Sequence, residues 1–157
     1  MSSIHVAALV SLSLVALAVS AQDKPDFSGE WVLNKAKSSL VKQLASIEKG
    51  TVHIEHEDPV FRFQRTFTFD GKDSSFGYEL TTDGKEVVSD EGNSKLYSRL
   101  YWEGDALVFF TRIVAPAGEA TNVVHYRVTG GGRELRAEEQ FRAPELSYDN
   151  VWVLDKQ

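Results

Sequence analysis

The sequence contains no cysteine among its 157 residues. This absence excludes a disulfide framework, a metal centre with cysteine ligands and a cysteine nucleophile. It also excludes a lipid anchor attached to an N-terminal cysteine. The folded state must therefore be stabilised by its core alone.

The sequence also lacks a cluster of basic residues. Its 17 Lys and Arg residues are outnumbered by 23 Asp and Glu residues, which gives a formal net charge of −6. An acidic protein without a basic patch repels the phosphate backbone of nucleic acids. The composition therefore argues against DNA or RNA as a partner.

No apolar run is long enough to span a bilayer, which takes roughly twenty residues in a helix. Val6–Val19 form a shorter apolar run, followed by the small residues Ser20 and Ala21 and the polar Gln22. This pattern is typical of a secretory signal peptide and its cleavage site. We predict a signal peptide over 1–21 and one exported domain over 22–157, secreted or periplasmic, without stable membrane insertion after cleavage. Because the first residues include no Lys or Arg, an uncleaved anchor is the alternative.

Turn signals divide the rest of the chain at intervals of about 8 to 14 residues, the rhythm of consecutive β-hairpins. They are Asp70-Gly71, Asp83-Gly84, Glu91-Gly92-Asn93, Glu103-Gly104-Asp105, Ala117-Gly118, Gly130-Gly131-Gly132 and Ala143-Pro144. Between them, apolar and polar residues alternate as in half-buried strands. Counting first strands at Phe27–Leu33 and Thr51–Glu57, the pattern predicts ten strands.

The clearest alternation runs from Val60 to Phe69. Its odd positions are Phe61, Phe63, Arg65, Phe67 and Phe69, whereas its even positions are mostly polar. In the last strand Tyr148, Trp152 and Leu154 share a face, although Val151 and Val153 leave the inner face ambiguous.

One segment, Ala36 to Glu48, has apolar residues at helical spacing. These are Leu40, Val41, Leu44 and Ile47. The expected fold is therefore an all-β, up-and-down antiparallel barrel of about ten strands, with one short helix between the first two. Such a meander tends to close, because closure removes exposed sheet edges.

A resemblance to a known superfamily supports this fold. Gly29-Glu30-Trp31 carries the G-x-W motif of the calycins, which include lipocalins and fatty-acid-binding proteins. The run Pro25–Ser38 and the segments Ile54–Pro59, Thr82–Lys85 and Trp102–Val108 resemble small secreted bacterial proteins described as lipocalin-like. The resemblance covers nearly all of the predicted domain and indicates its fold better than its function. The predicted barrel, with its aromatic interior and one inward arginine, is what leads us to expect a small apolar or amphipathic ligand inside it.

The sequence departs from fatty-acid-binding proteins in two respects. Those proteins hold the ligand carboxylate with an Arg-x-Tyr pair on the final strand, whereas Asn150–Leu154 contain neither residue. They also have two helices after the first strand, and this chain has room for one.

Arg65 is the most informative candidate site residue, because its position places a guanidinium among inward-facing phenylalanines. A buried charge must be paired and hydrogen-bonded. Glu139 shares its strand face with Leu135 and Ala137 and is a suitable partner. Two hypotheses follow: Arg65 and Glu139 form an internal ion pair, or Arg65 holds the acidic group of a ligand.

The inward aromatic residues also allow two interpretations. They are Phe61, Phe63, Tyr78, Phe109, Tyr126 and Phe141. With Arg65 and Glu139, they could line a ligand cavity. They could instead fill a narrow barrel, whose outer surface would then bind a protein or an envelope component.

Motifs for catalysis, metal binding and cofactor binding are absent from the sequence. His53 and His56 would lie on opposite faces of a strand, and so would Glu138 and Glu139. There is no nucleophile elbow, metalloprotease motif, P-loop or dinucleotide fingerprint. We therefore expect a binding protein rather than an enzyme, with no cofactor, and the sequence does not indicate an oligomeric state.

Overall fold

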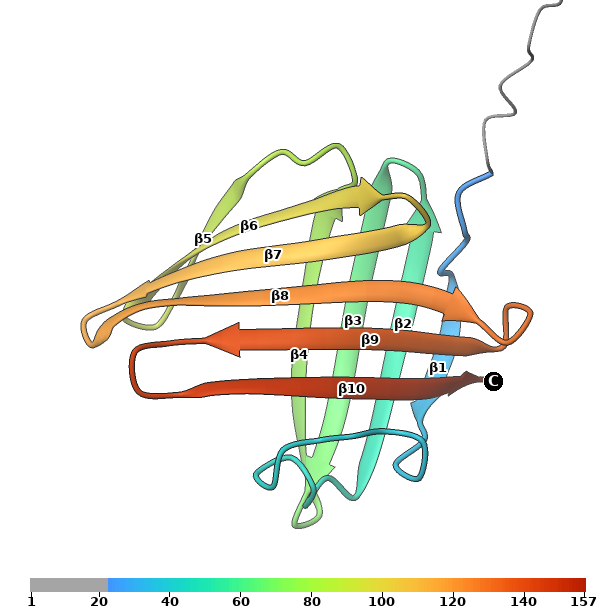
Figure 1. The fold of residues 1–157 in the computed structure, drawn as a ribbon, viewed down its shortest axis with the longest axis horizontal. Helices are drawn as coiled ribbons and strands as arrows, with labels where there is room; N and C mark the ends of the chain where they lie inside the picture. Colours follow the sequence, from blue (N-terminus) through green and yellow to red (C-terminus); the bar gives the residue numbers. More distant parts are fainter. Residues whose placement is uncertain (1–22) are drawn as a thin grey trace, which may run out of the picture.

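The computed structural model describes residues 23–157. The predicted signal peptide lies outside these residues. The described part contains ten strands, shown in Figure 1. They are β1 (Gly29–Leu33), β2 (Lys49–Glu57), β3 (Val60–Phe69), β4 (Lys72–Thr81), β5 (Val87–Glu91), β6 (Ser94–Glu103), β7 (Ala106–Ala115), β8 (Gly118–Thr129), β9 (Glu134–Arg142) and β10 (Ser147–Lys156).

All ten strands belong to one antiparallel sheet. Their spatial order is β4-β3-β2-β1-β10-β9-β8-β7-β6-β5, so every hairpin connects neighbours and β1 pairs with β10. The predicted up-and-down barrel is therefore confirmed. Turn glycines such as Gly92 and Gly104, at φ 58° and 62°, adopt the left-handed conformation that tight hairpins require.

The sheet folds into two walls whose strands cross at a steep angle. In Figure 1, β1 to β4 form one wall and β6 to β10 the other. The barrel is nearly closed, but β4 and β5 do not pair with each other. A single bridge between Asp83 and Tyr101 links the two sides of this gap. The gap leaves one region of the wall open next to the interior.

The end of the barrel near the start of the chain is tightly packed. Phe27, Trp31, Phe61, Leu100 and Leu107 are all completely buried there. The indole Nε1 of Trp31 donates to the carbonyl oxygen of Phe27 at 3.0 Å, which fixes the segment before β1 against the barrel. The G-x-W tryptophan therefore has a structural role, closing this end.

The predicted helix between β1 and β2 is wrong. Residues 35–37 and 42–46 form separate hydrogen-bonded turns. Between them, Ser39 pairs with Val151 of β10, and the side chain of Asn150 accepts a 2.8 Å hydrogen bond from the Val41 amide. These bonds extend the middle of the segment and interrupt helical hydrogen bonding. Leu40 and Leu44 nevertheless pack on the core, and Ile47 is buried, as their apolar character requires.

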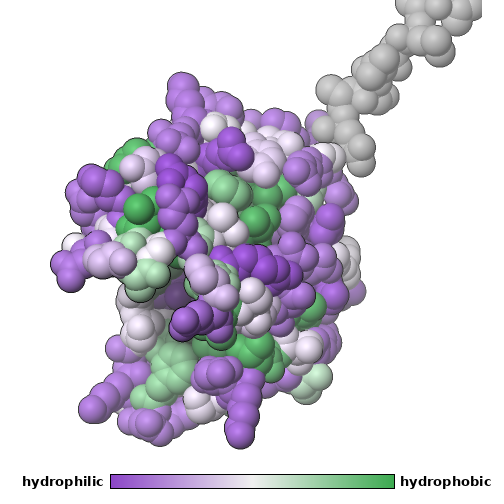
Figure 2. Space-filling model, turned by 60° about the vertical axis from the view of Figure 1, so that its left-hand side comes forward, coloured by the Kyte–Doolittle hydropathy of each residue, from purple (hydrophilic) through white to green (hydrophobic). Residues whose placement is uncertain are grey.

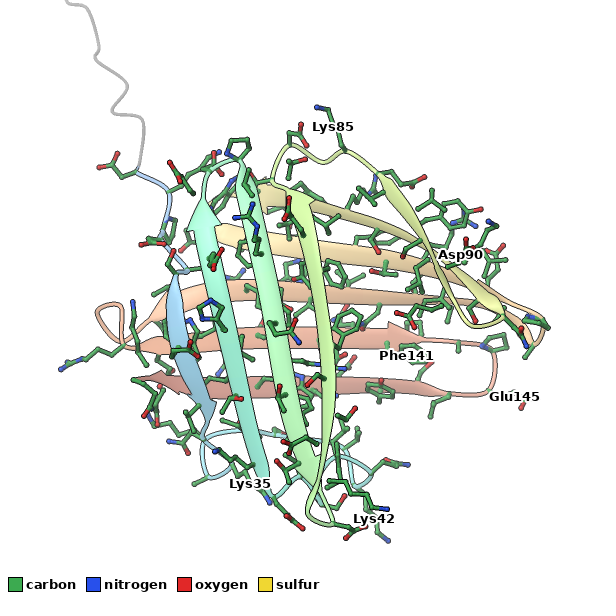
Figure 3. All side chains as sticks on the ribbon, turned by 180° about the vertical axis from the view of Figure 1, so that it is seen from behind. Lys35, Lys42, Lys85, Asp90, Phe141 and Glu145 are labelled. Atoms are coloured by element: carbon green, nitrogen blue, oxygen red, sulfur yellow. The ribbon has the colours of Figure 1, made fainter. Side chains whose placement is uncertain are left out.

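The side chain of Lys35 also stabilises this loop through hydrogen bonds. Its ammonium donates to the carbonyl oxygens of Ala45 and Ile47 at 3.2 and 2.6 Å. Figure 3 shows Lys35 and Lys42 in this segment, below the strands. Within residues 23–157, no helix has the length and apolar character needed to cross a membrane.

Candidate functional site

The interior of the barrel is not filled. A cavity of about 380 Å³ lies between the two walls and opens on one side. Side chains from β2 to β4 and from β6 to β10 line it, together with Leu44 of the β1–β2 loop. This volume lies within the range of about 300–1,000 Å³ typical of small-molecule sites.

Stacked aromatic rings form much of the cavity wall. Tyr78 lies against Phe109 with ring centroids 4.5 Å apart and an interplanar angle of 3°. Phe63 stacks on the same tyrosine at 5.0 Å. Phe67 of β3 stacks on Trp152 of β10 at 5.2 Å, joining the two walls. The lining of the cavity is therefore predominantly apolar.

The mouth of the cavity lies beside the gap between β4 and β5. Phe76 of β4, Leu96 of β6 and Phe141 of β9 are among the residues that line the cavity. Figure 3 shows Phe141 between the ribbons of β4 and β5. Figure 2 brings this side forward and shows a recess in the surface with hydrophobic residues beside it. An apolar molecule therefore has a route from solvent into the barrel.

Arg65 points into the cavity from β3, as its position in the alternating pattern predicts. Its guanidinium lies 4.8 Å from the ring centroid of Phe67 and 5.2 Å from that of Phe76. Cation–π contacts of this kind favour a charged group over an aromatic face. Among residues 23–157, however, Arg65 makes no side-chain hydrogen bond and no ion pair within 4.0 Å.

Glu139 faces the same cavity from β9, on the opposite wall. Three neutral donors hold its carboxylate: Asn122 at 3.2 Å on one oxygen, and Asn150 and Trp152 at 2.8 and 2.9 Å on the other. Such bonds to an ionised group are stronger than bonds between neutral groups. The network satisfies most of the hydrogen-bonding capacity of the carboxylate within the protein.

The hypothesis of a direct Arg65–Glu139 ion pair is therefore wrong. The two side chains share one cavity, but they lie on opposite walls and their charged atoms are more than 4.0 Å apart. Amide and indole groups, rather than a guanidinium, offset the cost of placing the carboxylate inside the barrel.

Two tyrosines deep in the site have strongly altered acidity. Burial raises the pKa of Tyr126 to about 12 and raises the pKa of Tyr78 well above its ordinary value of 10. The hydroxyl groups of Tyr78 and Tyr126 are neighbours, and each affects the pKa of the other. Within the described residues, neither the buried hydroxyl of Tyr78 nor the buried side-chain oxygen of Asn122 makes a hydrogen bond.

The structure brings together seven of the eight predicted site residues. Those that line the cavity are Phe63, Arg65, Tyr78, Phe109, Tyr126, Glu139 and Phe141. The remaining residue, Phe61, does not: it is completely buried in the packed end, against Phe27 and His56. Position along β3 explains the difference, because Phe61 lies on the correct face but one pair of residues closer to the closed end.

Sequence reasoning missed the polar residues that hold Glu139. Asn122 shares its strand face with the inward Val124 and Tyr126, so the alternation could have identified it. Asn150 and Trp152 share a face of β10, but the neighbouring valines obscured which face is internal. Only the register of β9 against β10, with Asn150 opposite Glu139, shows that these groups meet.

Metal binding is not indicated by the geometry. Within the described part of the chain, no group of three or more His, Asp or Glu side chains is arranged to hold a metal ion.

Comparison with known proteins adds information about the fold alone. No family model and no curated protein matches the sequence. Among solved structures, a secretory abundant heat soluble protein from Ramazzottius varieornatus matches with a TM-score of 0.59 and 13% identity, covering 83% of this chain and 95% of that one. The two chains therefore share an antiparallel β-barrel fold.

Two further matches belong to this barrel class. Zebrafish ileal bile-acid-binding protein, complexed with cholic acid, matches with a TM-score of 0.55 and 14% identity over 83% of this chain and 98% of that one. A Schistosoma mansoni fatty-acid-binding protein, in complex with arachidonic acid, matches with a TM-score of 0.51 and 16% identity, covering 83% of this chain and 96% of that one. At these identities the likeness extends to the barrel and not to individual site residues.

Proposed function

We propose that this chain binds a small apolar or amphipathic molecule inside its barrel. The observation that carries the proposal is the cavity of about 380 Å³, lined mainly by aromatic and aliphatic side chains and open beside β4. Unfilled apolar volume forfeits dispersion contacts and is unfavourable in a protein whose interior serves only stability. A ligand would recover those contacts.

Barrels of the same fold support this function. The bile-acid-binding and fatty-acid-binding structures described above are complexes with cholic acid and arachidonic acid, and a fatty acid transporter shares the fold with a TM-score of 0.55. A barrel acting only through its outer surface, the alternative suggested by the sequence, would be expected to have a filled interior. The proposed role is binding rather than catalysis.

Fluorescence titration with Nile red, an uncharged polarity-sensitive dye, tests this function. We expect saturable enhancement of dye emission at one site per chain. Val124 is buried and lines the cavity, whereas its neighbour Val123 points to the outer face. Val124→Trp should occupy the cavity and weaken dye binding at least about tenfold, equivalent to 1.4 kcal/mol.

Val123→Trp is the matched control and should leave dye binding unchanged. Both variants are first checked for a cooperative thermal transition, so that loss of folding is not mistaken for loss of the site. Equal dye binding by the two variants would show that the dye does not enter the barrel and would contradict the proposal.

We further propose that the protein acts after export, in the periplasm or outside the cell. The support is the apolar run Val6–Val19 followed by Ser20 and Ala21. N-terminal sequencing of exported protein should start at Gln22. Retention of residues 1–21 in a membrane fraction would indicate an anchor instead.

A further inference from the structure

The cavity contains two opposite formal charges that do not neutralise each other directly. Arg65 presents its guanidinium from one wall with no hydrogen-bond acceptor among residues 23–157. Glu139 presents its carboxylate from the other wall. Both charges act on Tyr126: Arg65 lowers the pKa of this phenol and Glu139 raises it. The polar region of the cavity therefore has a positive side and a negative side.

Both Arg65 and Glu139 have hydrogen-bonding positions that no other residue of the described chain occupies. A guanidinium carries five N–H donors, and an ionised carboxylate has about four acceptor positions. Three of the acceptor positions of Glu139 are used, by Asn122, Asn150 and Trp152. The half-buried Arg65 therefore has donors free to bond a group in the cavity, and the Glu139 side has room for one more donor.

Two buried atoms without partners extend this pattern. The hydroxyl of Tyr78 can donate a hydrogen bond, and the side-chain oxygen of Asn122 can accept one. The orientation of the Asn122 amide is fixed by its bond to Glu139, because the reverse orientation would place its oxygen against a carboxylate. Both residues line the cavity. Buried polar atoms in native proteins normally have partners. Both of these atoms are therefore available to bond a polar group that enters the cavity.

The charge balance restricts what that group can be. Arg65 and Glu139 together contribute no net charge to the cavity. A ligand carboxylate would be attracted to Arg65 but repelled by Glu139 across the same low-dielectric space, and it would leave the cavity with a net negative charge. A neutral polar group makes the same hydrogen bonds without that repulsion and loses less hydration on entering.

We propose that the ligand is an uncharged amphiphile whose polar end both accepts and donates hydrogen bonds, as a hydroxyl or a primary amide does. Its oxygen accepts from Arg65 and Tyr78, and its O–H or N–H donates to Glu139 or Asn122. The apolar body lies among Phe63, Phe109 and the other cavity rings. This inference rests on the proposed function and names the ligand class for the same site.

A matched series of twelve-carbon compounds tests the inference by displacement of Nile red at pH 8. The series is 1-dodecanol, dodecanamide, dodecanoate and dodecane. We expect the alcohol and the amide to bind at least about tenfold more tightly than dodecanoate, which corresponds to about 1.4 kcal/mol. Dodecane should also bind more weakly than the alcohol, because it leaves the polar atoms unpartnered.

Three variants separate the two sides of the polar region. Arg65→Met should weaken binding of 1-dodecanol and of dodecanamide about tenfold. Arg62→Met, on the outer face of β3, should leave their binding unchanged. Glu139→Gln should raise the affinity for dodecanoate relative to that for 1-dodecanol, because it removes the negative charge that repels the ligand carboxylate. Arg62 is a suitable control because it is exposed and pairs with Glu79 and Glu55 outside the barrel.

The outcomes distinguish this inference from the proposed function. Tighter binding of dodecanoate than of both neutral compounds would overturn the inference and leave binding inside the barrel intact. Equal affinity for dodecane and 1-dodecanol would also overturn it. If Nile red itself failed to distinguish Val124→Trp from Val123→Trp, the proposed function would fail.

Discussion

Arg65 and Glu139 face one cavity from opposite walls of the barrel, and Glu139 is held by three neutral donors rather than by the guanidinium. The two residues should therefore contribute to stability independently. In a double-mutant cycle with Arg65→Met and Glu139→Leu, we expect a coupling energy below about 1 kcal/mol. Denaturant unfolding of the four proteins measures it.

The two single variants of that cycle should differ strongly in their free energy of unfolding. Arg65→Met should change the free energy of unfolding by less than about 1 kcal/mol, because no protein acceptor loses a bond. Glu139→Leu should cost at least about 2 kcal/mol, because it leaves Asn122, Asn150 and Trp152 without their acceptor. A coupling of about 3 kcal/mol or more would mean that the charges are paired after all.

Two phenylalanines on the same face of β3 should respond differently to truncation. Phe61 is completely buried in the closed end, so Phe61→Ala should cost about 3–5 kcal/mol. Phe63 already borders the cavity, so Phe63→Ala removes fewer contacts and should cost clearly less. Thermal unfolding of the two variants makes the comparison, and equal losses would mean that the interior is packed uniformly.

Asn150 should be essential for the loop between β1 and β2. It is buried, accepts a hydrogen bond from the Val41 amide at 2.8 Å and donates to Glu139 at 2.8 Å. Asn150→Ala should therefore cost about 2–4 kcal/mol, because it leaves polar groups unpaired at both ends of the lost side chain. Amide hydrogen exchange at Val41 should become faster.

Ser46→Ala is the control for that variant. The Ser46 hydroxyl is exposed and donates only to the carbonyl oxygen of Gln43, at 3.3 Å. Its removal should leave both the stability and the exchange rate at Val41 unchanged. Unchanged protection of the Val41 amide in Asn150→Ala would contradict the loop contacts described above.

Burial of Tyr126 and Tyr78 should make stability fall in strong base. The pKa of Tyr126 is about 12 in the folded protein, above its ordinary value of 10. Above pH 10 the tyrosine ionises in the unfolded chain but stays protonated in the folded protein, so the free energy of unfolding falls. The contribution of Tyr126 is fully present below pH 10 and is lost as the pH rises from 10 to 12. The loss attributable to Tyr126 is at most about 3 kcal/mol.

Phenolate absorbance at 295 nm checks this prediction. Fewer than all five tyrosines should titrate near pH 10 in the folded protein, and the rest should ionise only at higher pH or on unfolding. Tyr126→Phe should remove one late-titrating group. Simultaneous titration of all five near pH 10 would contradict the burial of both side chains.

The ten-strand meander could be predicted because alternation and turn residues are local signals. Val60–Phe69 matched the observed β3 at both ends, and the parity of that strand correctly placed Arg65 inside the barrel. The predicted helix was wrong because Ser39 and Val41 bond to residues of β10, more than a hundred positions later. Helical spacing alone carries no information about such distant partners.

Most members of the candidate site could be predicted, but the polar residues that hold Glu139 and the arrangement of the charges could not. Alternation identifies which side chains point inward, and it identified Arg65 and Glu139. It does not give the distance between side chains on opposite walls, which decides whether the two charges meet. It also does not give the depth at which a residue lies, which is why Phe61 was assigned to the cavity and lies in the closed end.

The measurement that tests the account most directly is native mass spectrometry of the protein purified from its own host under gentle conditions. We predict a complex of one small molecule per chain, released by mild activation, with a mass and fragmentation that fit an apolar body. Val124→Trp should be purified without it, and Val123→Trp should retain it. Spectra showing only ligand-free protein in every condition, with Nile red binding unaffected by Val124→Trp, would contradict a ligand-binding barrel.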